Sequence, residues 1–367
     1  MGARVRGLGS PRLPRAGAPP ATTPLLEGVR CTITELPAWP FGVACLPDGA
    51  GAVLTLPRAG ARGLIGLRAG SPWSVARVVW TADAVAPRGL AIERTGRHAV
   101  VANSCGGLLI VACARLFADE DTDPILVSVP SPGIESMQVV LTPDERHAIV
   151  ADEASATLSV FALDGSLSSS DPGAELVGQV RVPAGPVGLA CTPDGRDLVV
   201  VCQVDGRCGR ICVLRLEDVV RDPARAEHVS AAAGASPVRV AVSGDGALAW
   251  VTLRGANTLV AFDLAGVRAG ARRTVRAAVR VGAAPVGLAV LDGGSLVVVA
   301  NSNRYGADAM SPQSLSVVDA SAALSGRAPV LGTITAGAFP RELAALPDDR
   351  GVLVTNVLSQ SLQSAQF

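Results

Sequence analysis

A short apolar run, an Asp-Gly-like turn and a second apolar run recur seven times along the chain. The clearest copies are residues 186–201 and 285–301. We call the first residue of each copy its anchor, and the anchors are Pro40, Pro87, Ser136, Pro186, Pro237, Pro285 and Pro340. Since repetition at a nearly fixed spacing is the mark of a repeat architecture, the pattern predicts seven similar structural units.

Each copy contains segments of strand length that are rich in Val, Leu and Ala. In the fourth copy, Leu189–Cys191 and Leu198–Val201 are predicted as the first two strands, and Ile211–Leu214 as the third. Asp-Gly at 48–49, 194–195 and 245–246 predicts a two-residue hairpin turn between strands one and two, because these residues tolerate positive φ. A further strand precedes the next anchor. Four antiparallel strands in about 40–50 residues are typical of a propeller blade.

The ends of the repeat region complement each other. Arg30–Glu35 is predicted as a fourth strand with no first three strands before it, whereas the last copy ends in a weak third strand, Ser361–Gln363. An N-terminal strand that completes the C-terminal blade would close the ring and leave no exposed edge. We therefore predict an all-β, seven-bladed β-propeller over residues 29–367, preceded by a disordered lead, residues 1–28.

Composition restricts the classes of function. Apolar residues make up 49% of the chain, but no apolar run reaches the ~20 residues that a membrane span requires. The formal net charge is zero, and aromatic residues are 3%, so neither a basic face nor stacking platforms for nucleic acid are expected. We expect a monomer. As written, the sequence has no secretory signal and predicts a cytoplasmic protein, or an exported one if the true N-terminus is missing.

Eight cysteines leave three alternatives open. They are free buried thiols, a disulfide between Cys202 and Cys208, or a metal bound by these two and Cys212, although the spacing lacks the paired C-x₂-C pattern of zinc sites. His98 and His147 follow turns on the face opposite the expected site. No nucleophile elbow, P-loop or dinucleotide fingerprint occurs. We therefore expect neither a metal nor a cofactor.

Polar residues converge on the other rim of the channel, where the anchors and the ends of the second strands meet. After the anchors come Arg88, Arg239, Arg341 and Glu342, with Glu135 beside one anchor. At or just after the ends of the second strands come Asn103, Asp152, Glu153, Gln203, Arg254, Asn301 and Asn356. The loop 302–314 adds Asn303, Arg304, Tyr305 and Asp308. Guanidinium groups suit carboxylates or phosphates; alternatively, the Asn residues cap turns and the Arg and Glu residues pair between blades.

The repeated phrases resemble those of the seven-bladed YVTN-repeat propellers, which are grouped with lactonase-like propellers. The resemblance rests on A-P-V-G-L-A at 284–289, on F-P-R-E-L at 339–343 and on L-V-T-N at 353–356, and it covers residues 29–363. Blades one and four depart from the motif, with Leu56 and Cys202 in place of Asn. Among related propellers, the resemblance implies binding proteins, lactone hydrolases, lactonizing enzymes and a lyase.

Two functions follow as hypotheses. The first is a binding protein that presents a polar face to a small anionic ligand or a protein partner. The second is a lactonase, cyclase or lyase, metal-independent or weakly metal-dependent, which is expected to hold a carboxylate of raised pKa in the channel mouth. The expected catalytic residues are Glu342, Asp152 and Tyr305. The expected ligand-binding residues are Arg88, Arg239, Arg341, Asn103, Asn301, Asn303, Arg304 and Asn356.

Overall fold

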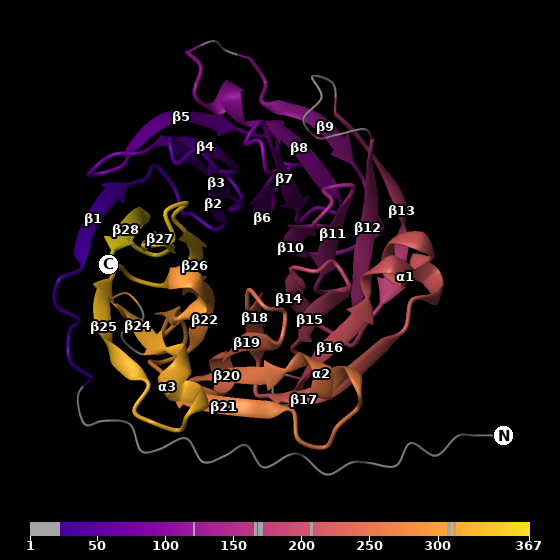
Figure 1. Cartoon of the computed structure of the whole chain (residues 1–367). Coiled ribbons are helices and arrows are strands. Elements are labelled where there is room, and N and C mark those ends of the chain that lie inside the picture. The colour runs from indigo at the N-terminus through magenta and orange to yellow at the C-terminus, as the bar shows by residue number, and fades with distance from the viewer. Residues whose placement is uncertain are drawn as a thin grey trace.

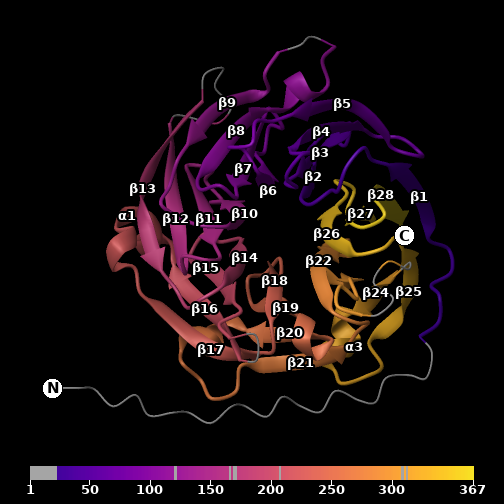
Figure 2. The ribbon, with the colours of Figure 1, turned by 180° about the vertical axis from the view of Figure 1, so that it is seen from behind.

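The computed structural model describes residues 23–119, 122–164, 167, 172–205, 208–306, 310 and 313–367. They form seven four-stranded antiparallel sheets arranged radially around a central axis (Figures 1 and 2). The predicted seven-bladed β-propeller is confirmed. In each sheet the first strand after the anchor lies innermost and lines the channel.

The first four blades are continuous in sequence. Blade 1 consists of β2 (Val43–Cys45), β3 (Gly51–Leu56), β4 (Gly63–Arg68) and β5 (Ser74–Trp80). Blade 2 consists of β6 (Pro87–Ile92), β7 (His98–Asn103), β8 (Leu108–Ala112) and β9 (Ile125–Val129). Blade 3 consists of β10 (Ser136–Leu141), β11 (His147–Asp152), β12 (Thr157–Asp164) and β13 (Gly173–Arg181). Blade 4 consists of β14 (Pro186–Cys191), β15 (Asp197–Cys202), β16 (Gly209–Arg215) and β17 (His228–Gly234).

The remaining three blades include the one that closes the ring. Blade 5 consists of β18 (Pro237–Val242), β19 (Leu248–Leu253), β20 (Thr258–Asp263) and β21 (Val275–Arg280). Blade 6 consists of β22 (Pro285–Leu291), β23 (Leu296–Asn301), β24 (Gln313–Asp319) and β25 (Val330–Ala336). Blade 7 consists of β26 (Pro340–Ala345), β27 (Gly351–Asn356), β28 (Ser361–Gln366) and β1 (Arg30–Glu35).

Short helices interrupt the connections and were not predicted from the sequence. Three α-helices follow the third strands of blades 4, 5 and 6, namely α1 (Leu216–Arg221), α2 (Leu264–Arg268) and α3 (Ala320–Leu324). The 3₁₀ turns are η1 (Cys113–Leu116), η2 (Pro223–Arg225), η3 (Arg254–Ala256) and η4 (Asp292–Gly294). Asp263 and Asp319 cap α2 and α3 by accepting backbone N–H groups. In the described part of the chain, no helix is long and apolar enough to cross a membrane.

The repeat register found in the sequence corresponds to a pairing between neighbouring strands. In six blades the anchor faces the residue sixteen positions later across the first two strands, as in Pro186↔Cys202 and Ser136↔Asp152. Directly after each of these anchors the pairing register shifts, which marks a β-bulge. Since a bulge redirects side chains, this feature positions the residues that follow the anchor.

The turn between strands one and two is longer than predicted. In blade 4, Thr192 N donates to Asp197 O, so the loop contains the four residues 193–196 rather than two. Asp194 Oδ1 accepts from Thr192 Oγ1 at 2.6 Å and from Arg196 N at 3.1 Å. These bonds stabilise the longer loop, while Gly195 takes the required positive φ of 69°.

The ring closes as predicted, through β1 and β28. Arg30 pairs with Gln366 and Glu35 with Ser361 across the whole length of both strands. The weak strand expected at 361–363 extends to Gln366, because it has partners on both sides. Most of the expected lead lies outside the described residues, but residues 24–26 bond to β25: Leu26 N donates to Thr333 O at 2.8 Å.

Apolar side chains fill the spaces between blades, and three threonines add hydrogen bonds there. The larger apolar clusters combine strands from two neighbouring blades; one of them joins Val160 of blade 3 to Val200 of blade 4. Thr252 Oγ1 accepts from Arg239 N at 3.1 Å in its own blade and donates to Val286 O at 2.7 Å in the next. Thr55 and Thr355 form the same bridges in blades 1 and 7.

Candidate functional site in the channel mouth

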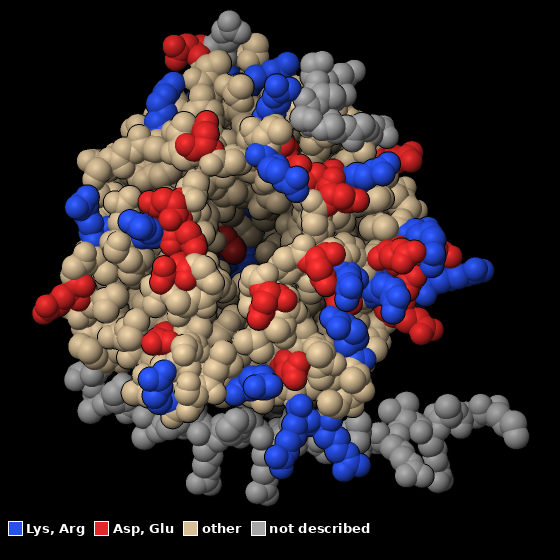
Figure 3. Space-filling view, in the orientation of Figure 1, with Lys and Arg blue, Asp and Glu red and all other residues tan. Residues whose placement is uncertain are grey.

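The centre of the ring is hollowed, and both basic and acidic atoms are visible inside it (Figure 3). The innermost strands line this channel, and in six blades the first two residues after the anchor lie at a bulge. In blade 1 the pairing shows no register shift, and Phe41 and Gly42 occupy the equivalent positions. The first residues are Phe41, Arg88, Met137, Val187, Val238, Val286 and Arg341. The second residues are Gly42, Gly89, Gln138, Gly188, Arg239, Gly287 and Glu342. We call these fourteen residues the bulge residues.

Two of the bulge residues form an ion pair between blades 5 and 7. Arg239 Nη2 lies 2.7 Å from Glu342 Oε2, and Arg239 Nε lies 3.0 Å from Glu342 Oε1. Arg239 Nη1 also donates to Val187 O of blade 4 at 2.8 Å. The side chain of Arg239 is 4% exposed and that of Glu342 is 17% exposed. Since both groups are occupied by each other, this pair fits the alternative in which Arg and Glu pair between blades.

Arg341 is buried without a comparable partner. Its guanidinium lies 3.8 Å from the centroid of the Phe41 ring, and the residue is 7% exposed. Among the described residues its Nε has no hydrogen-bond partner. Burial, followed by repulsion from Arg239, lowers the pKa of Arg341 to about 9, so the group remains a cation at neutral pH. A buried cation of this kind favours an anion in the adjacent space.

Four arginines alternate with three aromatic rings around the mouth, and we call this series the cation–aromatic arc. Its members, in order, are Arg88, Phe41, Arg341, Phe339, Arg304, Tyr305 and Arg254, each cation lying 3.8–5.9 Å from the neighbouring ring centroids. Such contacts stabilise a cation without neutralising it. Nε of Arg88, like that of Arg341, has no hydrogen-bond partner in the described part of the chain.

An acidic pair on blade 3 lies in the same mouth. Glu153 N donates to Glu135 O at 3.1 Å, so the two residues are neighbours on adjacent loops. Burial and the charge of Glu135 raise the pKa of Glu153, whereas Arg88, Arg254 and Arg341 act in the opposite direction. The mouth therefore contains a carboxylate of raised pKa within electrostatic reach of three arginines.

The residues at the ends of the second strands do not lie in this mouth. We call Asn103, Asp152, Asn301 and Asn356 the strand-end residues; all four are buried. Asp152 accepts from Ser159 Oγ at 2.6 Å and from Ser136 Oγ at 2.7 Å, inside blade 3. Its expected catalytic role is therefore not supported by its position, which is that of a hydrogen-bond acceptor within a blade.

The three strand-end asparagines also bond inside their own blades. Asn103 Oδ1 accepts from Ala86 N at 2.9 Å, and Asn301 Nδ2 donates to Ser316 Oγ at 2.9 Å. Asn356 Nδ2 donates to Ser361 Oγ at 3.3 Å. Oδ1 of Asn301 and of Asn356 has no partner among the described residues. These hydrogen bonds fit the alternative in which the asparagines cap turns.

Glycines leave the space that the side chains of Asp152, Asn301 and Asn356 occupy inside their blades. A Cβ added at Gly133 would meet the Asp152 carboxyl at 2.2 Å, and one at Gly282 would meet the Asn301 amide at 2.5 Å. Gly337 has the same relation to Asn356. Each glycine lies three residues before an anchor, so this signal was readable in the sequence.

The loop of blade 6 carries the exposed part of the site. Asn303 has a φ of 41° and its carbonyl accepts from Gly306 N at 2.9 Å, so it forms the turn that presents Arg304 and Tyr305. Tyr305 is 70% exposed between Arg254 and Arg304. Asp308 lies outside the described residues.

Two aromatic residues of the site were missed by the sequence analysis. Phe41 is a bulge residue, and Phe339 directly precedes an anchor with a φ of 55°. Only charged and amide residues were considered at these positions. The residue before the anchor has a positive φ in blades 3 to 7, so this conformation belongs to the repeated backbone and not to Phe339 alone.

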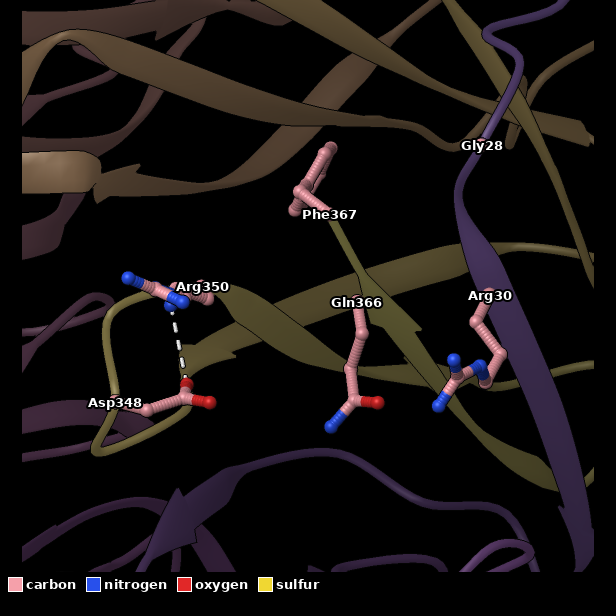
Figure 4. A pocket seen from close by; sticks show the side chains of 6 residues that line it. All are labelled: Gly28, Arg30, Asp348, Arg350, Gln366 and Phe367. Carbon is pink, nitrogen blue, oxygen red and sulfur yellow. Dashed lines mark hydrogen bonds between the residues drawn. The ribbon is translucent and has the colours of Figure 1, made fainter.

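Other features do not add a site. A surface hollow at the closing seam is lined by Gly28, Arg30, Asp348, Arg350, Gln366 and Phe367 (Figure 4). The dashed line in the figure is the hydrogen bond that Arg350 N donates to Asp348 at 3.1 Å.

All eight cysteines are free; Cys202 and Cys212 are buried neighbours, whereas Cys208 is exposed. Among the described residues no group of three or more His, Cys, Asp or Glu side chains could hold a metal ion.

Comparisons with known proteins support the fold. No family model matches the chain, and no curated protein matches its sequence. Among solved structures, the chain is similar to one described as Kuenenia stuttgartiensis hydrazine synthase, with a TM-score of 0.71 and 15% sequence identity. The match covers 91% of this chain and 97% of that one. At this identity the likeness shows the propeller fold alone, so the YVTN-repeat resemblance rests on the blade phrases.

Proposed function

We propose that the protein binds a small organic anion in the channel mouth, with Arg341 and Arg88 as its main contacts. The observation that carries this proposal is Arg341, a buried guanidinium whose Nε has no hydrogen-bond partner among the described residues. Leaving such a group unsatisfied has a substantial energetic cost, and a carboxylate would supply the missing acceptor.

The balance of charge in the mouth supports an anionic ligand. Among the described residues, once the Arg239–Glu342 pair is set aside, the four arginines of the cation–aromatic arc face the two carboxylates of Glu135 and Glu153. The ring centroids of Phe41 and Phe339 lie 3.8 and 5.9 Å from the Arg341 guanidinium. A carboxylate attached to an apolar or planar body fits both the charge and the rings.

Isothermal titration calorimetry on the full chain tests the proposal. Benzoate, hexanoate, citrate and inorganic phosphate are titrated beside benzamide and hexanamide, which lack the charge. At least one anion is expected to bind at least tenfold more tightly than its amide. Arg341→Met should weaken that binding about 10- to 100-fold, the range for a hydrogen bond to a charged group.

A control variant separates this site from general electrostatics. Arg350→Met removes an exposed arginine at the closing seam and should leave anion affinity unchanged. Arg341→Met should not lower the melting temperature of the free protein, because it removes a buried cation that forms no ion pair with any described residue. Full anion affinity in Arg341→Met, or no binding across the panel, would contradict the proposal.

A second candidate function is hydrolysis, cyclisation or lyase chemistry on a small carboxylate-bearing substrate. It is favoured by Glu153, whose raised pKa beside three arginines suits proton transfer. Glu153 therefore replaces Glu342 as the proposed proton-transfer residue, since Glu342 is bound by Arg239 through both oxygens. Turnover of a lactone panel that disappears in Glu153→Gln would support catalysis; turnover retained in that variant would oppose it.

A further inference from the structure

The channel mouth is electrically asymmetric. The cation–aromatic arc draws its members from blades 5, 6, 7, 1 and 2, whereas Glu135 and Glu153 both belong to blade 3. In the described part of the rim, a ligand would therefore meet the cation–aromatic arc on five blades and the unpaired carboxylates on blade 3.

Blade 3 carries the acidic pair Glu135 and Glu153, but the backbone hydrogen bond that joins these two positions occurs in six blades. In six blades the residue after the second strand end donates its N–H to the carbonyl of the residue before the anchor, at 2.8–3.1 Å. These pairs are Ala86 and Ser104, Glu135 and Glu153, Gly185 and Gln203, Ser236 and Arg254, Ala284 and Ser302, and Phe339 and Val357. Only blade 3 among them carries two acids. Two carboxylates on adjacent loops repel each other, which a cation between them would relieve.

Neither carboxylate forms an ion pair with the arginines around it in the described structure. No ion pair within 4.0 Å joins Glu135 or Glu153 to any described residue. Glu135 has a φ of 57°, and the residue before the anchor has a positive φ in blades 4 to 7 as well, so the repeated backbone sets the position of this side chain.

We infer that the ligand of the channel mouth is a zwitterion, whose carboxylate contacts Arg341 and Arg88 and whose ammonium group lies against Glu135 and Glu153. This inference rests on the proposed anion-binding function and adds the second charge of the ligand. The ligand class is that of amino acids and short peptides, with an apolar chain or ring against Phe41 and Phe339. The buried Arg341 fixes one end, and the acidic pair of blade 3 selects the other.

A series of amino acids tests the inference on the full chain. Glycine, β-alanine, 4-aminobutanoate, 5-aminopentanoate and 6-aminohexanoate place the ammonium at increasing distance from the carboxylate. Phenylalanine adds a ring to the series. Each is compared by calorimetry with the carboxylate that lacks the amino group, such as butanoate, hexanoate or 3-phenylpropanoate. At least one amino compound is expected to bind tenfold or more tightly than its counterpart, and the preferred length reports the span between the two charged regions.

Variants assign the effect to the acidic pair. The double variant Glu135→Gln, Glu153→Gln should lose the tenfold preference while retaining affinity for the simple carboxylate. Glu227→Gln, at an exposed position outside the mouth, should retain the preference. If every carboxylate binds as tightly as its amino counterpart, the zwitterion inference is wrong and anion binding stands. If neither series binds, the proposed function fails and this inference fails with it.

Discussion

Arg88 and Arg341, among the bulge residues, and the strand-end residues were all predicted to lie in the channel mouth, yet they differ in the contacts of their polar groups. Asn103 and Asp152 form hydrogen bonds inside their own blades. Arg88 and Arg341 lie beside aromatic rings, and their Nε atoms have no hydrogen-bond partner in the described part of the chain. Anchor and strand end face each other across one pair of strands, so position alone does not separate the two groups. Their contacts do, because the strand-end side chains form hydrogen bonds inside their own blades, whereas the two arginines are cations beside aromatic rings.

Arg239 and Glu342 are bulge residues by position. Their polar groups are satisfied within the protein, as those of Asn103 and Asp152 are. Glu342→Gln should lower the free energy of unfolding by about 3–5 kcal/mol, because it leaves the Arg239 cation buried without its carboxylate. Chemical denaturation measures the change. Replacing both members, as Arg239→Met with Glu342→Leu, should recover most of the loss. A Glu342→Gln protein of normal stability but altered ligand affinity would show that this pair contributes to ligand binding and not to stability.

Asn103 offers the corresponding test among the strand-end residues. Asn103→Ala should cost about 1–3 kcal/mol of stability, because the N–H groups of Ala86 and Cys105 lose their acceptor. Its affinity for the best anion should remain that of the unchanged protein. Arg88→Met should give the reverse pattern, with weaker binding and little change in unfolding. If both variants changed stability alone, the distinction between the two groups would collapse.

The smallest expected effect is a dependence on pH at Asp152. Burial raises its pKa despite hydrogen bonds from Ser159 and Ser136. The folded state therefore holds this proton more tightly than the unfolded chain, so stability is greatest below the unfolded pKa of ~3.9 and falls as pH rises through the raised value. Asp152→Asn removes this fall, and its melting temperature should rise relative to the unchanged protein across that range.

Asp144, in the turn of the same blade, provides a control of opposite sign. Burial acts to raise its pKa, but hydrogen bonds from Thr142 and Arg146 outweigh burial and lower it. The stability that the carboxylate adds is present above ~3.9 and is lost as pH falls through the lowered value. Asp144→Asn should therefore become less stable than the unchanged protein as pH rises toward ~3.9. Equal pH profiles for the two variants would contradict both assignments.

The blades could be predicted from the sequence because each blade repeats the same local sequence pattern. The anchor, the turn and the strand end recur at fixed offsets, and the structure shows them as one pairing register. The site was predicted in part: Arg88, Arg304, Arg341 and Tyr305 meet in the mouth, with Glu342 on a bulge there. The bulge after the anchor was not foreseen, so the aromatic contribution of Phe41 and Phe339 was missed. Which cation lacks a partner depends on contacts between blades far apart in sequence, and no local pattern contains them.

Because β1 pairs with β28, blade 7 can be completed only after the whole chain has been synthesised. β1 is made before every other strand, but β28, its partner, is made after more than 300 further residues. At about 5–20 residues per second, β1 waits on the order of tens of seconds. Its Thr32, Thr34 and Glu35 make this waiting strand polar. Leu26, which bonds to Thr333 of blade 6, can attach before β28 emerges and hold β1 beside the place where it will pair.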